Sequence, residues 1–148
     1  MADHVFIVCQ GAVPGPRFLD GRTANGTVGL ARTTGRGFTG TRWARHEFAQ
    51  NIFVFECLGD VPGNRFLDGR TADGTVGLAP SHQPPFTGTR WRGTPQEGGI
   101  WAFECLGDIP GNRFLDGRTG DGTVGLAPNT DPPFTGTRWM FEVPIDDG

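Results

Sequence analysis

Three copies of one segment follow each other along the chain, and their spacing never changes. Each copy runs from a Cys to a Trp, and equivalent residues lie 48 positions apart: Cys9, Cys57 and Cys105, then Trp43, Trp91 and Trp139. The second and third copies differ at five of these 35 positions, and the first differs from the second at ten. This repetition indicates one structural unit used three times. A glycine-rich unit of 48 residues buries too little apolar surface to fold alone, so we expect a single domain over 1–148, with repeats at approximately 5–52, 53–100 and 101–148.

Composition narrows the class of protein. The 25 Gly and 12 Pro would be typical of disorder without a period, but the repeat makes them turn residues. The formal net charge is −3, whereas nucleic-acid binders carry a basic excess. No apolar run reaches the ~18 residues of a membrane span, and the N-terminus lacks the basic and apolar regions of a signal peptide. We therefore expect no nucleic-acid partner and no membrane span. We also expect a monomer or weak homo-oligomer, located in the cytoplasm or exported without a signal peptide.

Each copy predicts four short strands. In 53–57 the residues Phe53, Phe55 and Cys57 are apolar, and Glu56 points the other way. This period of two indicates a half-buried strand. The second and third strands are expected at 65–68 and 75–79. Between them lies Asn-Gly or Asp-Gly, which favours a type I′ hairpin turn. The fourth strand is expected to include Gly-Thr-Arg-Trp and to run into a variable connection, 44–52 or 92–100. No segment has the period of an α-helix.

Twelve strands in three copies resemble the β-trefoil family. The matching features are an opening apolar strand, then Gly-x-x-Phe-Leu-Asp-Gly, then Gly-Thr-Val-x-Leu, then a closing Trp. The resemblance covers nearly the whole chain, from about Val5 to Val143. It implies an all-β protein with twelve strands and pseudo-threefold symmetry. A threefold β-prism is the alternative arrangement.

The cysteines and histidines do not predict chemistry. Three Cys cannot all pair, and no C-x-x-C spacing exists, so we interpret them as small buried side chains. A site with three Cys on the threefold axis is the alternative. The three His occupy non-equivalent positions and form no metal-binding spacing. We expect no metal, no cofactor and no catalytic residue.

Charged residues repeated in all three copies are the best candidates for a site. A fold requires its apolar residues and its glycines, but it does not require the same Asp and Arg three times. Ligand binding is one explanation, recent duplication is another, and a structural Asp–Arg pair that stabilises each hairpin is a third. The repeated sets are Asp20, Asp68 and Asp116; Arg22, Arg70 and Arg118; Arg17, Arg65 and Arg113; and Arg42, Arg90 and Arg138.

The position of these Asp residues is similar to that in ricin B-type lectins. In that family an Asp after the second-strand apolar pair accepts hydrogen bonds from sugar hydroxyls, which implies this role for Asp20, Asp68 and Asp116. The chain departs from the family because Thr-Arg-Trp replaces Gln-x-Trp, and Ala31, Ala79 and Ala127 stand near the expected stacking aromatic. The available aromatics are Phe38, Phe86 and Phe134, which alternatively cover the core. The neighbouring candidates for ligand binding are Arg22, Arg70, Arg118, Asn64 and Asn112.

The sequence therefore predicts a non-enzymatic carbohydrate-binding protein with up to three equivalent shallow sites, whose partners are glycans or glycoconjugates. Copy one should differ, since Pro16 replaces Asn64 and residues 32–37 replace the proline-rich 80–85. One alternative is a protein-binding molecule such as a protease inhibitor, which would use the connections 44–52 or 92–100. The other is a structural or interaction protein with no small ligand.

Overall fold

The computed structural model describes residues 3–12, 14–35, 38–60, 62–108, 110–131 and 134–143. The end of the third predicted repeat, 144–148, and residues 36–37 of the first-copy loop lie outside the described residues. The twelve strands are β1 (Asp3–Cys9), β2 (Phe18–Arg22), β3 (Thr27–Ala31), β4 (Trp43–Ala49), β5 (Ile52–Cys57), β6 (Phe66–Arg70), β7 (Thr75–Ala79), β8 (Trp91–Pro95), β9 (Ile100–Cys105), β10 (Phe114–Arg118), β11 (Thr123–Ala127) and β12 (Trp139–Glu142).

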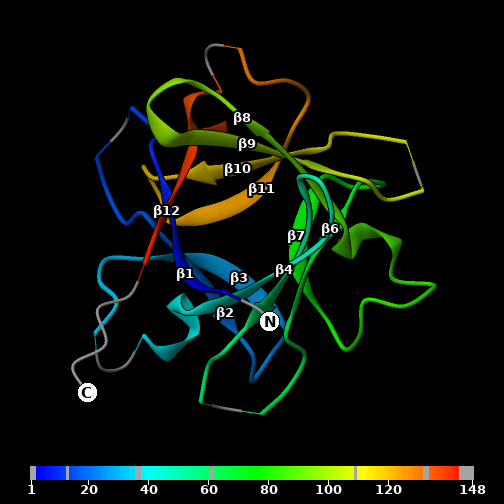
Figure 1. The fold of residues 1–148 in the computed structure, drawn as a ribbon. Coiled ribbons are helices and arrows are strands. Elements are labelled where there is room, and N and C mark those ends of the chain that lie inside the picture. Colours follow the sequence, from blue (N-terminus) through cyan, green and yellow to red (C-terminus); the bar gives the residue numbers. More distant parts are fainter. Residues whose placement is uncertain are drawn as a thin grey trace.

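All these strands belong to one antiparallel sheet that closes on itself (Figure 1). The path β11-β3-β2-β1-β12-β9-β8-β5-β6-β7 returns to β11, which makes a closed barrel of ten strands. Two further strands lie off this ring, since β4 pairs with β1 and β5, and β10 pairs with β9 and β11. The first and last strands of the described chain, β1 and β12, are neighbours.

The prediction of a β-trefoil is corrected by this topology. The protein is all-β with twelve strands, but ten of them form a closed barrel and two are additional. Local alternation and turn residues specify each hairpin, whereas the pairings between copies depend on contacts between residues far apart in sequence. The third strands illustrate this point, because β3, β7 and β11 each pair with the other two, and nothing in one repeat predicts that.

The hairpin turns also differ from the prediction. Strands β6 and β7 pair up to Arg70 and Thr75, so the connection is four residues long. Gly74 has φ 77°, but among the described residues Asn51 is the only non-glycine with positive φ, so Asp73 does not adopt the type I′ conformation. Instead the Asp73 carboxylate accepts hydrogen bonds from Thr75 N (3.1 Å) and Oγ1 (2.6 Å). These bonds lower the pKa of Asp73.

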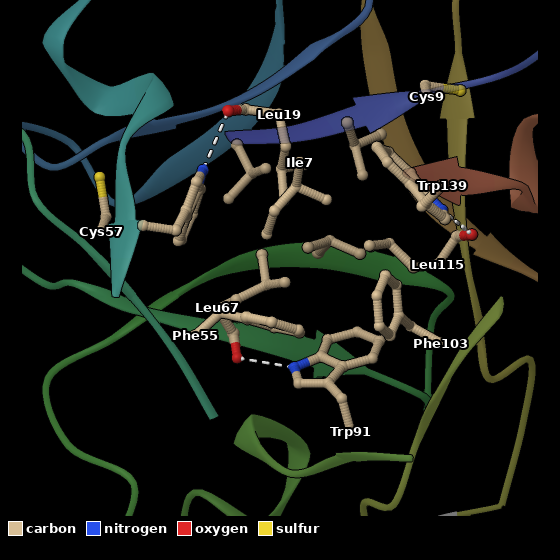
Figure 2. Packing of buried hydrophobic residues seen from close by; sticks show 14 of the residues in the cluster. Ile7, Cys9, Leu19, Phe55, Cys57, Leu67, Trp91, Phe103, Leu115 and Trp139 are labelled. Atoms are coloured by element: carbon tan, nitrogen blue, oxygen red, sulfur yellow. Dashed lines mark hydrogen bonds between the residues drawn. The ribbon is translucent and has the colours of Figure 1, made fainter. Parts of the chain in front are cut away.

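The fourth strand of each copy begins at the Trp and not before it. The preceding Thr-Gly-Thr forms a short 3-10 turn, as at Thr87–Thr89 before β8. Each buried Trp then donates its indole N–H to a Leu carbonyl of the second strand, for example Trp91 to Leu67 at 3.1 Å (Figure 2). The turn is thereby held against the hairpin of its own copy.

The core lies inside the barrel and draws on all three copies. Ile7, Phe55 and Phe103 occupy equivalent positions and are at most 1 % exposed (Figure 2). The predicted inward positions Phe53, Phe55 and Cys57 are confirmed, since all three are buried. The residues on the opposite face of the first strands are more buried than expected, since Phe6, Val8 and Val54 are also buried. In the described part of the chain, no helix is both long and apolar enough to cross a membrane.

Candidate ligand-binding hollows

Three equivalent hollows open on the surface, one beside each repeated Asp, and we call them the Asp20, Asp68 and Asp116 hollows. Their volumes are approximately 350, 190 and 220 Å³. Each is lined by the Asp-Gly-Arg-Thr that ends the second strand and by the Phe-Thr-Gly of the 3-10 turn. Residues of the next copy complete two of them, Gly59 at the Asp20 hollow, and Gly107 with Asp108 at the Asp68 hollow.

A glycine of the third strand places the arginine of each hollow. Asp68 and Arg70 lie on one face of β6, and Asp68 is paired in register with Gly77 of β7. A Cβ atom at Gly77 would lie 2.6 Å from the Arg70 guanidinium, so the missing side chain makes the space in which that group lies. The same holds for Gly29 with Arg22 and Gly125 with Arg118.

A second glycine allows the 3-10 turn to approach the carboxylate. A Cβ atom at Gly88 would collide with the carbonyl oxygen of Gly69 and would lie 2.6 Å from Asp68 Oδ1. Only glycine therefore lets the turn lie this close to the second strand. Gly40 and Gly136 have the equivalent contacts in the other two hollows.

A buried cysteine from a different copy lies under each hollow. The Cys105 thiol donates to the carbonyls of Gly69 (3.5 Å) and Gly88 (3.4 Å), and so connects the two glycine segments. Burial raises the pKa of this thiol. Cys57 and Cys9 make the same contacts under the Asp20 and Asp116 hollows. The prediction that the cysteines are small buried side chains is confirmed, and all three thiols are free.

The carboxylates are mostly buried but weakly paired. The Asp68 side chain is 14 % exposed, and its closest cationic atom is Arg70 Nε at 3.7 Å, on a side chain that is 47 % exposed. Asp20 and Asp116 have the same 3.7 Å distance to Arg22 and Arg118. Within the described residues, no hydrogen bond to any of these three carboxylates is formed. Burial raises the pKa of each one, and the nearby Arg only partly opposes that shift.

The structure brings most of the predicted site residues together and leaves two apart. Each hollow contains its Asp, its Arg and its Phe, namely Phe38, Phe86 or Phe134. Asn64 instead donates to the Leu78 carbonyl at 3.4 Å and lies near Gly26, and Asn112 lies near Gly74. Neither Asn lines a hollow: Asn64 bonds to the third strand of its own copy, and both Asn side chains lie beside the turn glycine of the preceding copy.

The sequence did not predict a role for the threonine that begins each 3-10 turn, nor for the residue whose backbone N–H donates a hydrogen bond to that threonine's hydroxyl. Thr87 Oγ1 accepts a hydrogen bond from Asp108 N, and Thr39 Oγ1 accepts one from Asp60 N, both at 3.1 Å. We call each such contact between a 3-10 turn and the following first-strand end a junction. At the third junction, which joins copies three and one, Thr135 Oγ1 accepts from Ala12 N at 3.1 Å, so an Ala stands where the other two junctions have an Asp. Both the repeated Thr and the Asp-to-Ala change are visible in the sequence, but their proximity is not.

No cluster of three or more His, Cys, Asp or Glu suited to a metal is found in the described ranges. Comparison with known proteins adds no relationship: no protein-family model matches the chain, and no curated protein matches it. The resemblance to ricin B-type lectins is therefore corrected, since the barrel topology contradicts it and no family match supports it.

Proposed function

We propose that the protein binds carbohydrates, without catalysis, in the Asp20, Asp68 and Asp116 hollows. One observation carries the proposal: each hollow holds a mostly buried carboxylate that accepts no hydrogen bond from the described residues. The carboxylate oxygens keep some contact with solvent, because among the described residues only His82 Nδ1 is a fully buried side-chain polar atom without a partner. Partial burial of a charged acceptor without a protein donor still costs solvation free energy. A ligand that brings donors into the hollow would remove that cost.

Sugar hydroxyls suit this arrangement. A carboxylate has about four acceptor sites and can accept from two adjacent hydroxyls, and charge-assisted hydrogen bonds are about twice as strong as neutral ones. The half-buried Phe86 ring lines the same hollow as Asp68 and supplies an apolar surface for the C–H face of a sugar. Arg70 adds donors for the sugar's oxygen atoms.

The geometry disfavours a purely structural Asp–Arg pair. A separation of 3.7 Å to a guanidinium on a half-exposed side chain is long for an ion pair. Because its cation is half exposed to solvent, such a pair should contribute little more than the ~0–1 kcal/mol of a fully exposed pair. Such a small contribution does not offset the burial of three carboxylates, so a role in ligand recognition explains the residues better.

Each hollow is small, so single-site binding should be weak. Two volumes, approximately 190 and 220 Å³, are below the range of about 300–1,000 Å³ for pockets that enclose a drug-sized ligand, and the third, approximately 350 Å³, is at its lower end. Three sites on one rigid body gain avidity on a surface that displays many copies of the ligand. A multivalent glycan is accordingly the expected partner.

A glycan array with neutral, acidic and aminated sugars tests the proposal. We expect the wild-type protein to bind, and the triple variant Asp20→Asn, Asp68→Asn, Asp116→Asn to lose most of that binding while it stays folded. Glu97→Gln, an exposed charge loss on a different turn, is the control and should bind normally. Absence of wild-type binding to every sugar class would refute the function.

The alternative of a protein-binding surface has one feature in its favour. Phe48, in the connection 44–52, is 51 % exposed, with the Arg90 guanidinium 5.6 Å from its ring centre. Phe48→Ser should leave glycan binding unchanged if the three hollows are the site. If this variant loses binding and the triple Asn variant keeps it, the connection is the functional surface instead.

A further inference from the structure

Two of the hollows have a neighbouring hollow with which they share lining residues of the 3-10 turn. The Asp68 hollow shares Phe86, Thr87 and Asp108 with a neighbouring hollow of approximately 190 Å³ that also contains Arg90. The Asp116 hollow likewise shares Thr135 with a neighbouring hollow of approximately 260 Å³ that contains Arg138. We call these neighbours the Arg90 hollow and the Arg138 hollow. The shared threonine places the two hollows of each pair side by side.

The two neighbouring hollows differ in charge. The Arg90 hollow is also lined by His82 and by Asp108, whose formal charge opposes that of Arg90. In the Arg138 hollow the equivalent residue is Ala12, and the other lining residues are Gln10, Thr130 and Thr135. Within the described residues, Arg138 makes no ion pair and no cation–π contact. The Arg138 hollow therefore carries one positive charge among neutral polar groups.

We infer that the ligand has at least two sugar units and that the unit in the Arg138 hollow carries an acidic group. The inference rests on the proposed function, since the first unit occupies the Asp116 hollow. A guanidinium presents a planar fork of N–H donors that matches a carboxylate. In the Arg90 hollow Asp108 repels an acidic unit. The preference for an acidic over a neutral sugar unit should therefore be found in the Arg138 hollow and not in the Arg90 hollow.

Sugar titrations followed by NMR test the inference. The amide of Thr87 reports binding at the Asp68 and Arg90 hollows, and the amide of Thr135 reports binding at the Asp116 and Arg138 hollows. The probes are glucose, galactose and mannose, their uronic acids, and the matching β-1,4-linked neutral and acidic disaccharides. At Thr135 we expect the acidic disaccharide to bind about tenfold more tightly than the neutral one, since one charge-assisted contact is gained. This preference should decrease with added salt.

Two reciprocal variants provide a matched control. Ala12→Asp places the second carboxylate at the third junction and should remove the preference for acid there. Asp108→Ala removes the equivalent carboxylate and should create the preference at Thr87. Arg138→Gln should abolish it at Thr135 while neutral binding in the Asp116 hollow continues.

The outcomes distinguish this inference from the proposed function. If monosaccharides bind as tightly as disaccharides, or if acidic and neutral disaccharides bind equally at Thr135, the inference is wrong and carbohydrate binding stands. If no probe shifts the residues around Asp68 or Asp116, carbohydrate binding fails and the inference fails with it.

Discussion

At the scale of single residues, two glycines of each copy leave space for different neighbours. Gly77 leaves space for a flexible side-chain end, the Arg70 guanidinium, whereas Gly88 faces the rigid backbone carbonyl of Gly69. A guanidinium can move away from an added methyl group, but the backbone of a paired strand cannot. The cost of adding a side chain should therefore differ sharply between these positions.

Gly88→Ala should lower the free energy of unfolding by about 1–3 kcal/mol, because the new Cβ overlaps the backbone of β6. Gly77→Ala should change it by less than about 1 kcal/mol, because it displaces only Arg70 and Ala suits a strand better than Gly. Urea denaturation of both variants checks this. Equal losses would mean that the Arg70 side chain is held rigidly.

The three buried carboxylates predict how stability depends on pH. Their raised pKa values mean that the folded protein binds these protons more tightly than the unfolded chain. The stabilisation is complete below the unfolded value near 3.8 and is lost as pH rises through the higher folded pKa values. The free energy of unfolding of the wild type, minus that of the triple Asn variant, should therefore fall as pH rises through this window.

Urea denaturation at several pH values measures that difference. Asp3, Asp73 and Asp121, whose pKa values are lowered, are present in both proteins and cancel. A difference that stays constant with pH would mean that the three carboxylates are solvated as in the unfolded chain.

The candidate site was predictable where it depends on repetition. Asp68, Arg70 and Phe86 are repeated in every copy, and the structure gathers them in one hollow. Asn64 is not repeated in copy one and lies elsewhere. Asp108 was missed because it reaches the Asp68 hollow from the next copy, and such contacts depend on pairings that no single repeat encodes.

At the scale of elements, hairpins were predicted better than their turns. The third strand occupies 75–79 as expected, and the second is shifted by one or two residues, to Phe66–Arg70. Apolar alternation locates strands well, but Asp-Gly is compatible with several turn geometries. Here the Asp73 side chain bonds to Thr75, and the turn becomes longer than a type I′ hairpin.

Gly74→Ala should destabilise the protein by about 1–2 kcal/mol, because φ 77° is unfavourable for a residue with a Cβ. Gly74→Asn should cost less, since Asn tolerates this conformation. Thermal unfolding of the two variants provides the measurement. If Asn costs as much as Ala, then steric contact and not the backbone angle determines the requirement for glycine.

At the scale of the whole molecule, the three copies depend on each other. Strand β1 pairs with β12, the third strands pair across copies, and the core combines Ile7, Phe55 and Phe103. Sequence repetition predicted the shared core. It did not predict the closed ten-stranded barrel, because a period of 48 residues says nothing about which copy each strand contacts.

This interdependence predicts one cooperative unfolding transition. Tryptophan fluorescence reports the buried Trp43, Trp91 and Trp139, and far-ultraviolet circular dichroism reports the sheet. Both signals should change at the same urea concentration, as expected for a two-state domain. Separate midpoints would show that one copy unfolds without the others.

The central claim is that the three carboxylate hollows bind sugar. The most direct measurement is amide chemical-shift mapping with the strongest-binding glycan from the array. We expect shifts at Gly21, Gly69 and Gly117 and in the adjoining 3-10 turns, and none of these in the triple Asn variant. Shifts confined to 44–52 or 92–100, or no shifts at all, would contradict the account.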